Sequence, residues 1–131
     1  MASWDDVRGI ALSLPETTEF AHGHDGLPSW RVKDKAFVWE SPLRKADINA
    51  LGAAAPTGEL LGVRVADLDA KEEVLAELPD VCFTIPHFND YPAVLVQLDR
   101  VDVADLEELI TDAWLARAPK KLAAEWAANN E

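Results

Sequence analysis

The sequence predicts an α+β domain with a mainly antiparallel β-sheet and helices packed on it. Helical hydrophobic periodicity is confined to the two ends of the chain and one stretch in the middle, while short apolar or alternating runs bounded by turn-forming residues occupy most of the rest. In the expected order of one helix, four strands, one helix, two strands and two helices, most strands directly follow another strand. This order favours antiparallel pairing.

The first helix and the last long helix have the clearest signals. Ser3 followed by Asp6 resembles a capping box, and the Leu14-Pro15 pair ends the first helix, because a residue before proline is pushed out of the helical region. The last long helix opens at Asp102 or Ala104. Its inward stripe has helical spacing and consists of Leu106, Leu109, Ile110, Ala113, Trp114 and Arg117.

Two further helices are expected. Asp67 is placed to cap a helix that continues to Leu78. The residues of this helix that face inward are Leu68, Leu75 and Leu78. Pro119 suits the first turn of a final short helix, whose apolar residues are Leu122 and Trp126.

Six short segments are typical of strands: residues 17–22, 30–33, 35–40, 60–65, 81–85 and 93–98. Trp30 and Trp39 are expected to point into the core. The turn at Lys33-Asp34 lacks the favoured Asn-Gly or Asp-Gly pair, so the register of this hairpin stays open. Residues 41–59 form a loop with a short helix around Asp47–Ala54.

Length and composition fit one intracellular domain. With 131 residues, 49% of them hydrophobic, the chain has the size and apolar content of a single domain spanning residues 1–131. The single cysteine, Cys82, excludes an internal disulfide and fits a reducing compartment. No basic leader is visible, and no apolar run approaches the ~20 residues that cross a bilayer. We expect a cytoplasmic protein that does not bind membranes and is a monomer or a homodimer.

The charge distribution limits where an anion can bind. The net charge of -12 repels polyphosphates at long range, which disfavours general affinity for DNA, RNA or anionic membranes. Residues 65–131 carry 5 basic and 15 acidic groups, whereas residues 31–64 carry 6 basic and 4 acidic groups. An anion-binding surface is therefore expected in the middle segment, whose cations are Arg31, Lys33, Lys35, Arg44, Lys45 and Arg64.

Three stretches of the chain resemble the MmcQ/YjbR family. The hairpin over Trp30–Phe37 is similar to the family's aromatic-basic-Val-x-Gly-Lys-x-Phe segment, with Asp34 where the family often has glycine. Pro86-His87-Phe88-Asn89 followed by Val94–Asp99 is similar to its His-x-Asn loop and the strand that ends in Leu-Asp. The final helix over Asp105–Ala118 completes a resemblance that covers nearly the whole chain.

This resemblance implies a double-wing fold and a non-enzymatic binding module with DNA as the ligand, because members are commonly described as DNA-binding by analogy with winged domains. In a winged domain, the cations of a β-hairpin contact phosphates. The wing here contains Arg31, Lys33 and Lys35, and the patch extends to Arg44, Lys45 and Arg64. The alternative is a solvated hairpin edge whose lysines block strand-to-strand aggregation.

The loop from His87 to Tyr91 supports a second hypothesis of a different class. Prolines bound this loop on both sides, and exposed His87, Asn89 and Tyr91 can line a pocket for a small molecule or contact a protein partner. Alternatively, His87 and Asn89 satisfy the backbone of the loop itself.

Signals for catalysis are few. His22, His24 and His87 are the ligands of a third hypothesis, a metal-dependent enzyme, to which a polar turn at residues 22–26 is the alternative. Cys82 lies in an expected strand, where a cysteine usually behaves as a small buried hydrophobe. The acidic residues of the helices are expected on solvated faces: Glu72, Glu73, Glu77, Asp105, Glu107, Glu108 and Asp112. We therefore expect no enzyme activity, no cofactor and no bound metal.

Overall fold

The computed structural model describes residues 2–21, 27–56 and 58–129. A six-stranded sheet with antiparallel neighbours throughout confirms the predicted α+β class. The helices are α1 (Trp4–Ser13), α2 (Lys45–Leu51), α3 (Leu68–Glu77), α4 (Val103–Arg117) and α5 (Lys120–Asn129), with short 3-10 helices at Gly52–Ala54 and Pro86–Phe88. The strands are β1 (Thr17–Ala21), β2 (Pro28–Val32), β3 (Lys35–Glu40), β4 (Leu60–Arg64), β5 (Cys82–Phe83) and β6 (Ala93–Gln97). Within the described residues, no helix is long and apolar enough to span a membrane.

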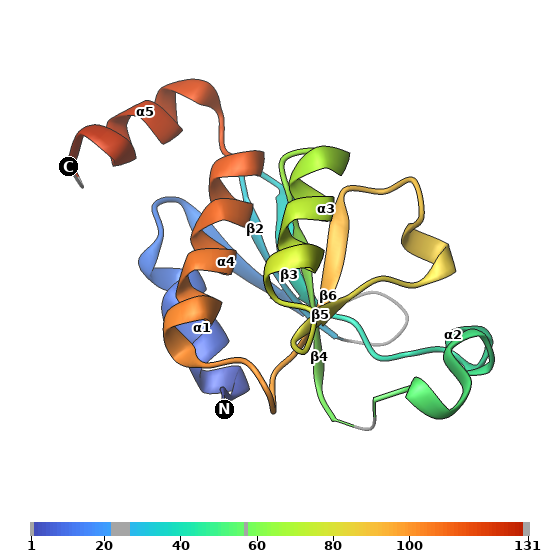
Figure 1. Ribbon diagram of the computed structural model, residues 1–131. Coiled ribbons are helices and arrows are strands. Elements are labelled where there is room, and N and C mark those ends of the chain that lie inside the picture. The colour runs from blue at the N-terminus through green and yellow to red at the C-terminus, as the bar shows by residue number, and fades with distance from the viewer. Residues whose placement is uncertain (1, 22–26, 57, 130–131) are drawn as a thin grey trace.

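The two faces of the sheet have different surroundings. The strand order is β1-β2-β3-β4-β6-β5, and α1, α3 and α4 lie against one face (Figure 1). Trp30 and Val32 of β2 are buried on this face, in the main core. Because side chains alternate along a strand, Ser29 and Arg31 point to the opposite face, which we call the open face. The strand register pairs Ser29 with Trp39 and so places the indole of Trp39 on the open face as well.

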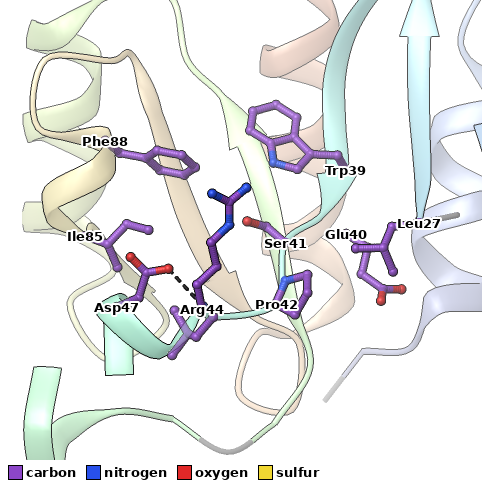
Figure 2. A pocket seen from close by; sticks show the side chains of 10 residues that line it. Leu27, Trp39, Glu40, Ser41, Pro42, Arg44, Asp47, Ile85 and Phe88 are labelled. Carbon is purple, nitrogen blue, oxygen red and sulfur yellow. Dashed lines mark hydrogen bonds between the residues drawn. The ribbon is translucent and has the colours of Figure 1, made fainter. Parts of the chain in front are cut away.

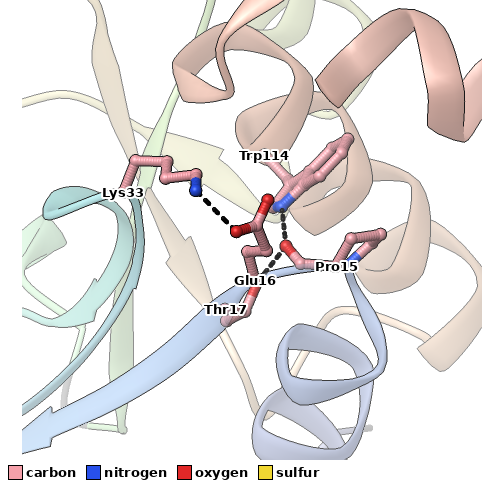
Figure 3. Close-up of polar contacts among 5 residues, drawn as sticks. All are labelled: Pro15, Glu16, Thr17, Lys33 and Trp114. Carbon is pink, nitrogen blue, oxygen red and sulfur yellow. Dashed lines mark hydrogen bonds and ion pairs between the residues drawn. The ribbon is translucent and has the colours of Figure 1, made fainter. Parts of the chain in front are cut away.

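Trp114 of α4 connects the main core to both ends of the chain. Its side chain is fully buried, and its ring lies 5.8 Å from the ring of Trp126 in α5, measured between centroids. The indole Nε1–H of Trp114 donates a hydrogen bond of 3.1 Å to the carbonyl oxygen of Pro15 (Figure 3). A buried indole N–H needs an acceptor, so this bond fixes the segment between α1 and β1 against α4.

The predicted helix caps are confirmed. Ser3 and Asp6 form the capping box of α1, in which the Ser3 N–H donates to Asp6 Oδ2 at 2.9 Å. The carboxylates of Asp67 and Asp102 each accept a backbone N–H at 2.8 Å in the first turns of α3 and α4. α1 ends before Leu14-Pro15, as predicted.

Two side-chain orientations differ from the prediction. Leu68 was expected to face inward, but it is the first residue of α3 and is 45% exposed. The interior position one turn later belongs to Lys71, which is only 5% exposed. Trp39 does not point into the main core but lies half-buried on the open face, because a strand residue reaches only the face that its register dictates.

Two predicted boundaries also shift. The helix predicted over Asp47–Ala54 begins at Lys45, because the Asp47 carboxylate accepts the Arg44 N–H at 3.0 Å and caps the helix earlier. The strand predicted over residues 81–85 is reduced to Cys82–Phe83, since a 3-10 helix follows at Pro86. The last residue of the strand predicted over 17–22 lies outside the described residues.

Lys33 and Asp34 form a two-residue turn between β2 and β3. The register that the sequence left open pairs Val32 with Lys35. Both turn residues have positive φ, 49° at Lys33 and 67° at Asp34, as a type I′ turn requires. This left-handed region costs roughly 1–2 kcal/mol for a residue with a Cβ atom, so the turn stores strain.

Replacing Asp34 by glycine is expected to raise the free energy of unfolding by about 0.5–1 kcal/mol, because relief of the Cβ clash outweighs the added entropy of the unfolded chain. Urea denaturation followed by tryptophan fluorescence measures the change. Asp34→Ala is the matched control, since it removes the same carboxylate and keeps a Cβ atom. Equal stability of the two variants would show that strain at this turn is negligible.

Candidate functional site on the open face of the sheet

A second apolar cluster covers one end of the open face. Loop 86–92 and α2 contribute to it, and they lie beyond the strands, away from α1 and α4 (Figure 1). Its buried members are Ile85, Phe88, Ala93 and Leu95, with Trp39, Leu43, Leu51 and Phe83 packed around them. The open face is therefore covered near β5 and β6, and Trp39 of β3 stands at the border of the covered part.

Gly62 allows the indole of Trp39 to lie close to the sheet. The strand register pairs Gly62 of β4 with Trp39 of β3. A Cβ atom at Gly62 would come within 2.3 Å of Trp39 Nε1, so only glycine permits this approach. The indole is also near the ring of Phe88, at 6.5 Å between centroids and with the planes at 77°. Trp39 is thus held in place by its neighbours while part of it stays accessible.

One hollow lies between Trp39 and α2, and we call it the Arg44 hollow. Its volume is about 270 Å³. Figure 2 shows the Arg44 side chain extending from the start of α2 toward Trp39 and Phe88, while the Asp47 carboxylate accepts the Arg44 N–H. The lining residues are Leu27, Trp39, Glu40, Ser41, Pro42, Leu43, Arg44, Asp47, Ile85 and Phe88.

A second hollow, which we call the Arg117 hollow, adjoins the first. Its volume is about 400 Å³, and it shares Leu27, Trp39 and Glu40 with the Arg44 hollow. The lining residues are Leu27, Pro28, Ser29, Arg31, Ala36, Trp39, Glu40, Tyr91 and Arg117. The two hollows therefore flank Trp39 and form one accessible strip on the open face.

Lys71 of α3 holds the loop that contributes Phe88 and Tyr91. Its Nζ donates to the carbonyl oxygens of Phe88 and Tyr91, the latter at 3.0 Å. Burial lowers the pKa of the Lys71 ammonium, and the nearby Asp90 carboxylate partly counteracts this shift. Lys71 was not predicted from the sequence, although its position three residues after Leu68 and four before Leu75 places it in the predicted inward stripe.

The structure separates the six candidate cations. Arg31 lies on the open face with its guanidinium carbon 4.2 Å from the Phe20 ring centroid, and Arg64 lies 5.1 Å from the Tyr91 ring centroid. Lys33 forms an ion pair of 2.5 Å with Glu16 near the hairpin turn (Figure 3). The three others lie elsewhere: Lys35 is exposed beside the turn, Arg44 lines its own hollow, and Lys45 is exposed at the start of α2.

Arg117, predicted from the sequence only as a member of a helical stripe, belongs to the open face. It is the last residue of α4 and lines the hollow named after it. Its Nε is buried and has no hydrogen-bond partner within the described part of the chain. The sequence feature that could have indicated this role is the arginine itself, which occupies a position of the stripe where an apolar residue is expected.

Of the predicted loop residues whose side chains the structure describes, Tyr91 lines a hollow and Asn89 does not. Tyr91 is 43% exposed, and its ring lies 5.8 Å from that of Phe88. Asn89 is exposed and ends the 3-10 helix, its N–H donating to the Pro86 carbonyl oxygen at 3.2 Å. The side chain of His87 and the whole of His22 and His24 lie outside the described residues. Among the residues that are described, no group of three His, Cys, Asp or Glu side chains could hold a metal ion.

Cys82 is a buried thiol. Its side chain is 3% exposed, and burial, with a smaller contribution from the Asp105 carboxylate, raises its pKa to about 12. The thiolate that nucleophilic chemistry needs is therefore scarce at neutral pH. Most of the helical carboxylates predicted to be solvated are exposed: Glu72, Glu73, Glu77, Glu107, Glu108 and Asp112. Asp105, which follows the cap of α4, is half-buried.

Comparison with known proteins relates the chain to one family. The model of the YjbR family matches residues 12–116. Over 133 aligned positions covering 99% of each chain, the sequence is 51% identical to uncharacterized proteins of Mycobacterium bovis and Mycobacterium tuberculosis. The crystal structure of Deinococcus radiodurans protein DR2400, which has a DUF419 domain, is similar with a TM-score of 0.67 and 20% identity, covering 97% of this chain and 89% of that one. At this identity, the likeness concerns the fold alone.

Cys82 is expected to react with 5,5′-dithiobis(2-nitrobenzoate) only after unfolding. A pKa of about 12 in place of 9.0 leaves about a thousandfold less thiolate at neutral pH. The measurement compares the reaction rate in buffer with the rate in concentrated urea, with glutathione as the exposed thiol. A rate in buffer close to that of glutathione would contradict the buried placement.

Lys71→Met is expected to lower the free energy of unfolding by about 1–3 kcal/mol, because two carbonyl oxygens lose their donor. It should also loosen the loop, which hydrogen exchange of the Ala93 N–H reports, since this group bonds to the Tyr91 carbonyl oxygen at 2.8 Å. Lys45→Met removes an exposed lysine and serves as the control in urea denaturation. A loss no larger than that of the control would rule out an anchoring role for Lys71.

Proposed function

The chain belongs to the YjbR family, and we propose that it is a non-enzymatic binding module that holds a small planar molecule on the open face of its sheet. One observation carries this proposal. The half-buried indole of Trp39 rests against Gly62 and separates two hollows, so a flat ligand can lie beside the ring and extend into both. Concave sites with an aromatic wall and a few polar groups are the usual form of small-molecule sites.

The placement of the site on rigid elements supports this proposal. Trp39, Gly62 and Ser29 belong to three paired strands, and the loop with Tyr91 is held by Lys71. Side chains supported in this way keep their geometry without a ligand, which lowers the entropy that binding must offset.

The DNA-binding hypothesis remains a prediction, and the positions of the cations favour the open face over the wing. Lys33 forms an ion pair with Glu16, while Arg31 lines the Arg117 hollow on the open face. Arg64 is held at Tyr91, 27 residues further along the chain, instead of at the hairpin. In a chain with a net charge of -12, phosphate contacts spread in this way give little nonspecific affinity.

We expect 2-naphthalenemethanol, a neutral planar probe, to shift the indole N–H signal of Trp39 in ¹H–¹⁵N spectra in a saturable manner. Trp39→Phe identifies the signal by its loss. The indole of Trp126, which packs on Trp114 in the main core, is the internal control. Equal shifts of the two indoles would contradict the proposed site.

A second experiment tests duplex DNA as the alternative ligand. Fluorescence anisotropy of labelled DNA between about 50 and 200 mM salt is expected to show no binding by the protein. Steeply salt-dependent binding that disappears in Lys33→Glu/Lys35→Glu would instead support the wing and count against the open face as the main binding surface.

A further inference from the structure

We propose that the Arg117 hollow binds an oxyanion, the carboxylate or phosphate group of an organic ligand, through Arg31, Arg64 and Arg117 around Tyr91. The inference rests on the proposed function, because it assigns the charged end of the ligand whose flat part lies at Trp39. It adds Arg117 to the cations that the sequence pointed to, and it selects Arg31 and Arg64 from among them.

The three arginines come from distant parts of the chain, and each lies at Tyr91 or at the hollow that Tyr91 lines. Arg31 belongs to β2, Arg64 is the last residue of β4, and Arg117 is the last residue of α4. Arg31, Arg117 and Tyr91 line the same hollow, and an Arg64 guanidinium nitrogen lies 3.4 Å from the hydroxyl oxygen of Tyr91. The fold therefore gathers positive charge at a position that no local segment of the sequence defines.

None of these arginines has an acidic partner in the described part of the chain. The ion pairs within 4.0 Å among the described residues are Arg8 with Glu19 and Lys33 with Glu16. The chain contains 24 acidic and 12 basic residues, so carboxylates are plentiful. Guanidinium groups that remain unpaired beside a hollow in such a protein have their charge available for an external anion.

Neighbouring groups hold two of the guanidinium groups in position. Arg31 Nε donates to Ser29 Oγ at 3.3 Å while its guanidinium lies over the Phe20 ring, and Arg64 Nε donates to the Val65 carbonyl oxygen at 3.2 Å. Both terminal nitrogens of Arg31 have no acceptor among the described residues. A guanidinium fixed at Nε presents its remaining planar edge in the geometry that matches a carboxylate or phosphate.

The third arginine provides an independent sign of an absent partner. Arg117 Nε is buried and forms no hydrogen bond within the described part of the chain. A buried donor on a charged group without an acceptor is costly. An anion in the adjoining hollow would offset this cost by compensating the charge of the guanidinium.

Glu40 is the carboxylate among the described residues that line this hollow. Burial, and then repulsion from Glu59, raises its pKa. A higher pKa makes protonation of Glu40 easier when an anion arrives, which reduces repulsion between the two groups. The presence of Glu40 is therefore compatible with anion binding beside the arginines.

The test compares three probes that share one ring system: 2-naphthoate, 2-naphthyl phosphate and the neutral 2-naphthalenemethanol. Dissociation constants come from NMR titrations of the full chain at about 150 mM salt, where long-range effects of net charge are screened. We expect at least one anionic probe to bind tenfold or more tightly than the neutral probe. The comparison between naphthoate and naphthyl phosphate identifies the preferred oxyanion.

Arg117→Gln is expected to reduce the affinity for the anionic probes to that of the neutral probe and to leave the neutral probe unaffected. Arg100→Gln removes an equal charge from an exposed arginine outside the hollow and should retain the preference for anions. Arg64→Gln provides a second test if Arg117→Gln folds poorly, which the dispersion of the amide signals reveals.

The outcomes separate this inference from the proposed function. Equal binding of all three probes would overturn the oxyanion site and leave the open face as the binding surface. A preference that Arg100→Gln abolishes as fully as Arg117→Gln would also overturn it, because the effect would then be one of net charge. Failure of every probe to bind would reject both proposals.

Discussion

The second face of the sheet depends on one buried charge. The ammonium of Lys71 has no ion-pair partner among the described residues and relies on the carbonyl oxygens of Phe88 and Tyr91. A buried cation is tolerated only where hydrogen-bond acceptors surround it, so the positions of α3 and loop 86–92 depend on each other. Through this contact, α3 on one face of the sheet fixes the positions of Phe88 and Tyr91 for the other face. Phe88 lines the Arg44 hollow, and Tyr91 lines the Arg117 hollow.

The two sides of the molecule use charge differently. Most acidic residues of α3 and α4 lie at the surface and the main core is apolar, whereas the open face combines aromatic rings with arginines. Phe20 and Tyr91 each lie beneath a guanidinium group, which lets the cation remain hydrated on one side while its position is restricted. A protein that is negative as a whole thus keeps a small positive surface where the strands are accessible.

The sequence was sufficient for the features that depend on local patterns. Caps at Ser3, Asp67 and Asp102, the order of helices and strands, and the position of the hairpin turn follow from residue types within a few positions of one another. The sequence was insufficient for Trp39 and Arg117. Alternation along a strand or a helical stripe assigns a residue to one face of its element, but it does not identify the residues that pack against that face. Membership of the candidate site is decided by strand register and by helix ends that meet only in the folded chain.

The hydrogen bond from Trp114 to Pro15 joins residues 99 positions apart and has a consequence for synthesis. A ribosome must release nearly the entire polypeptide before the segment between α1 and β1 can find its partner, since α4 follows all six strands. Strands β3 and β4 are therefore made before the helix that packs on their core-facing side, and folding is expected to be completed late and by long-range contacts. Arg117, the last residue of α4, is synthesised at the same late stage. The proposed binding surface therefore forms only when the main core is completed.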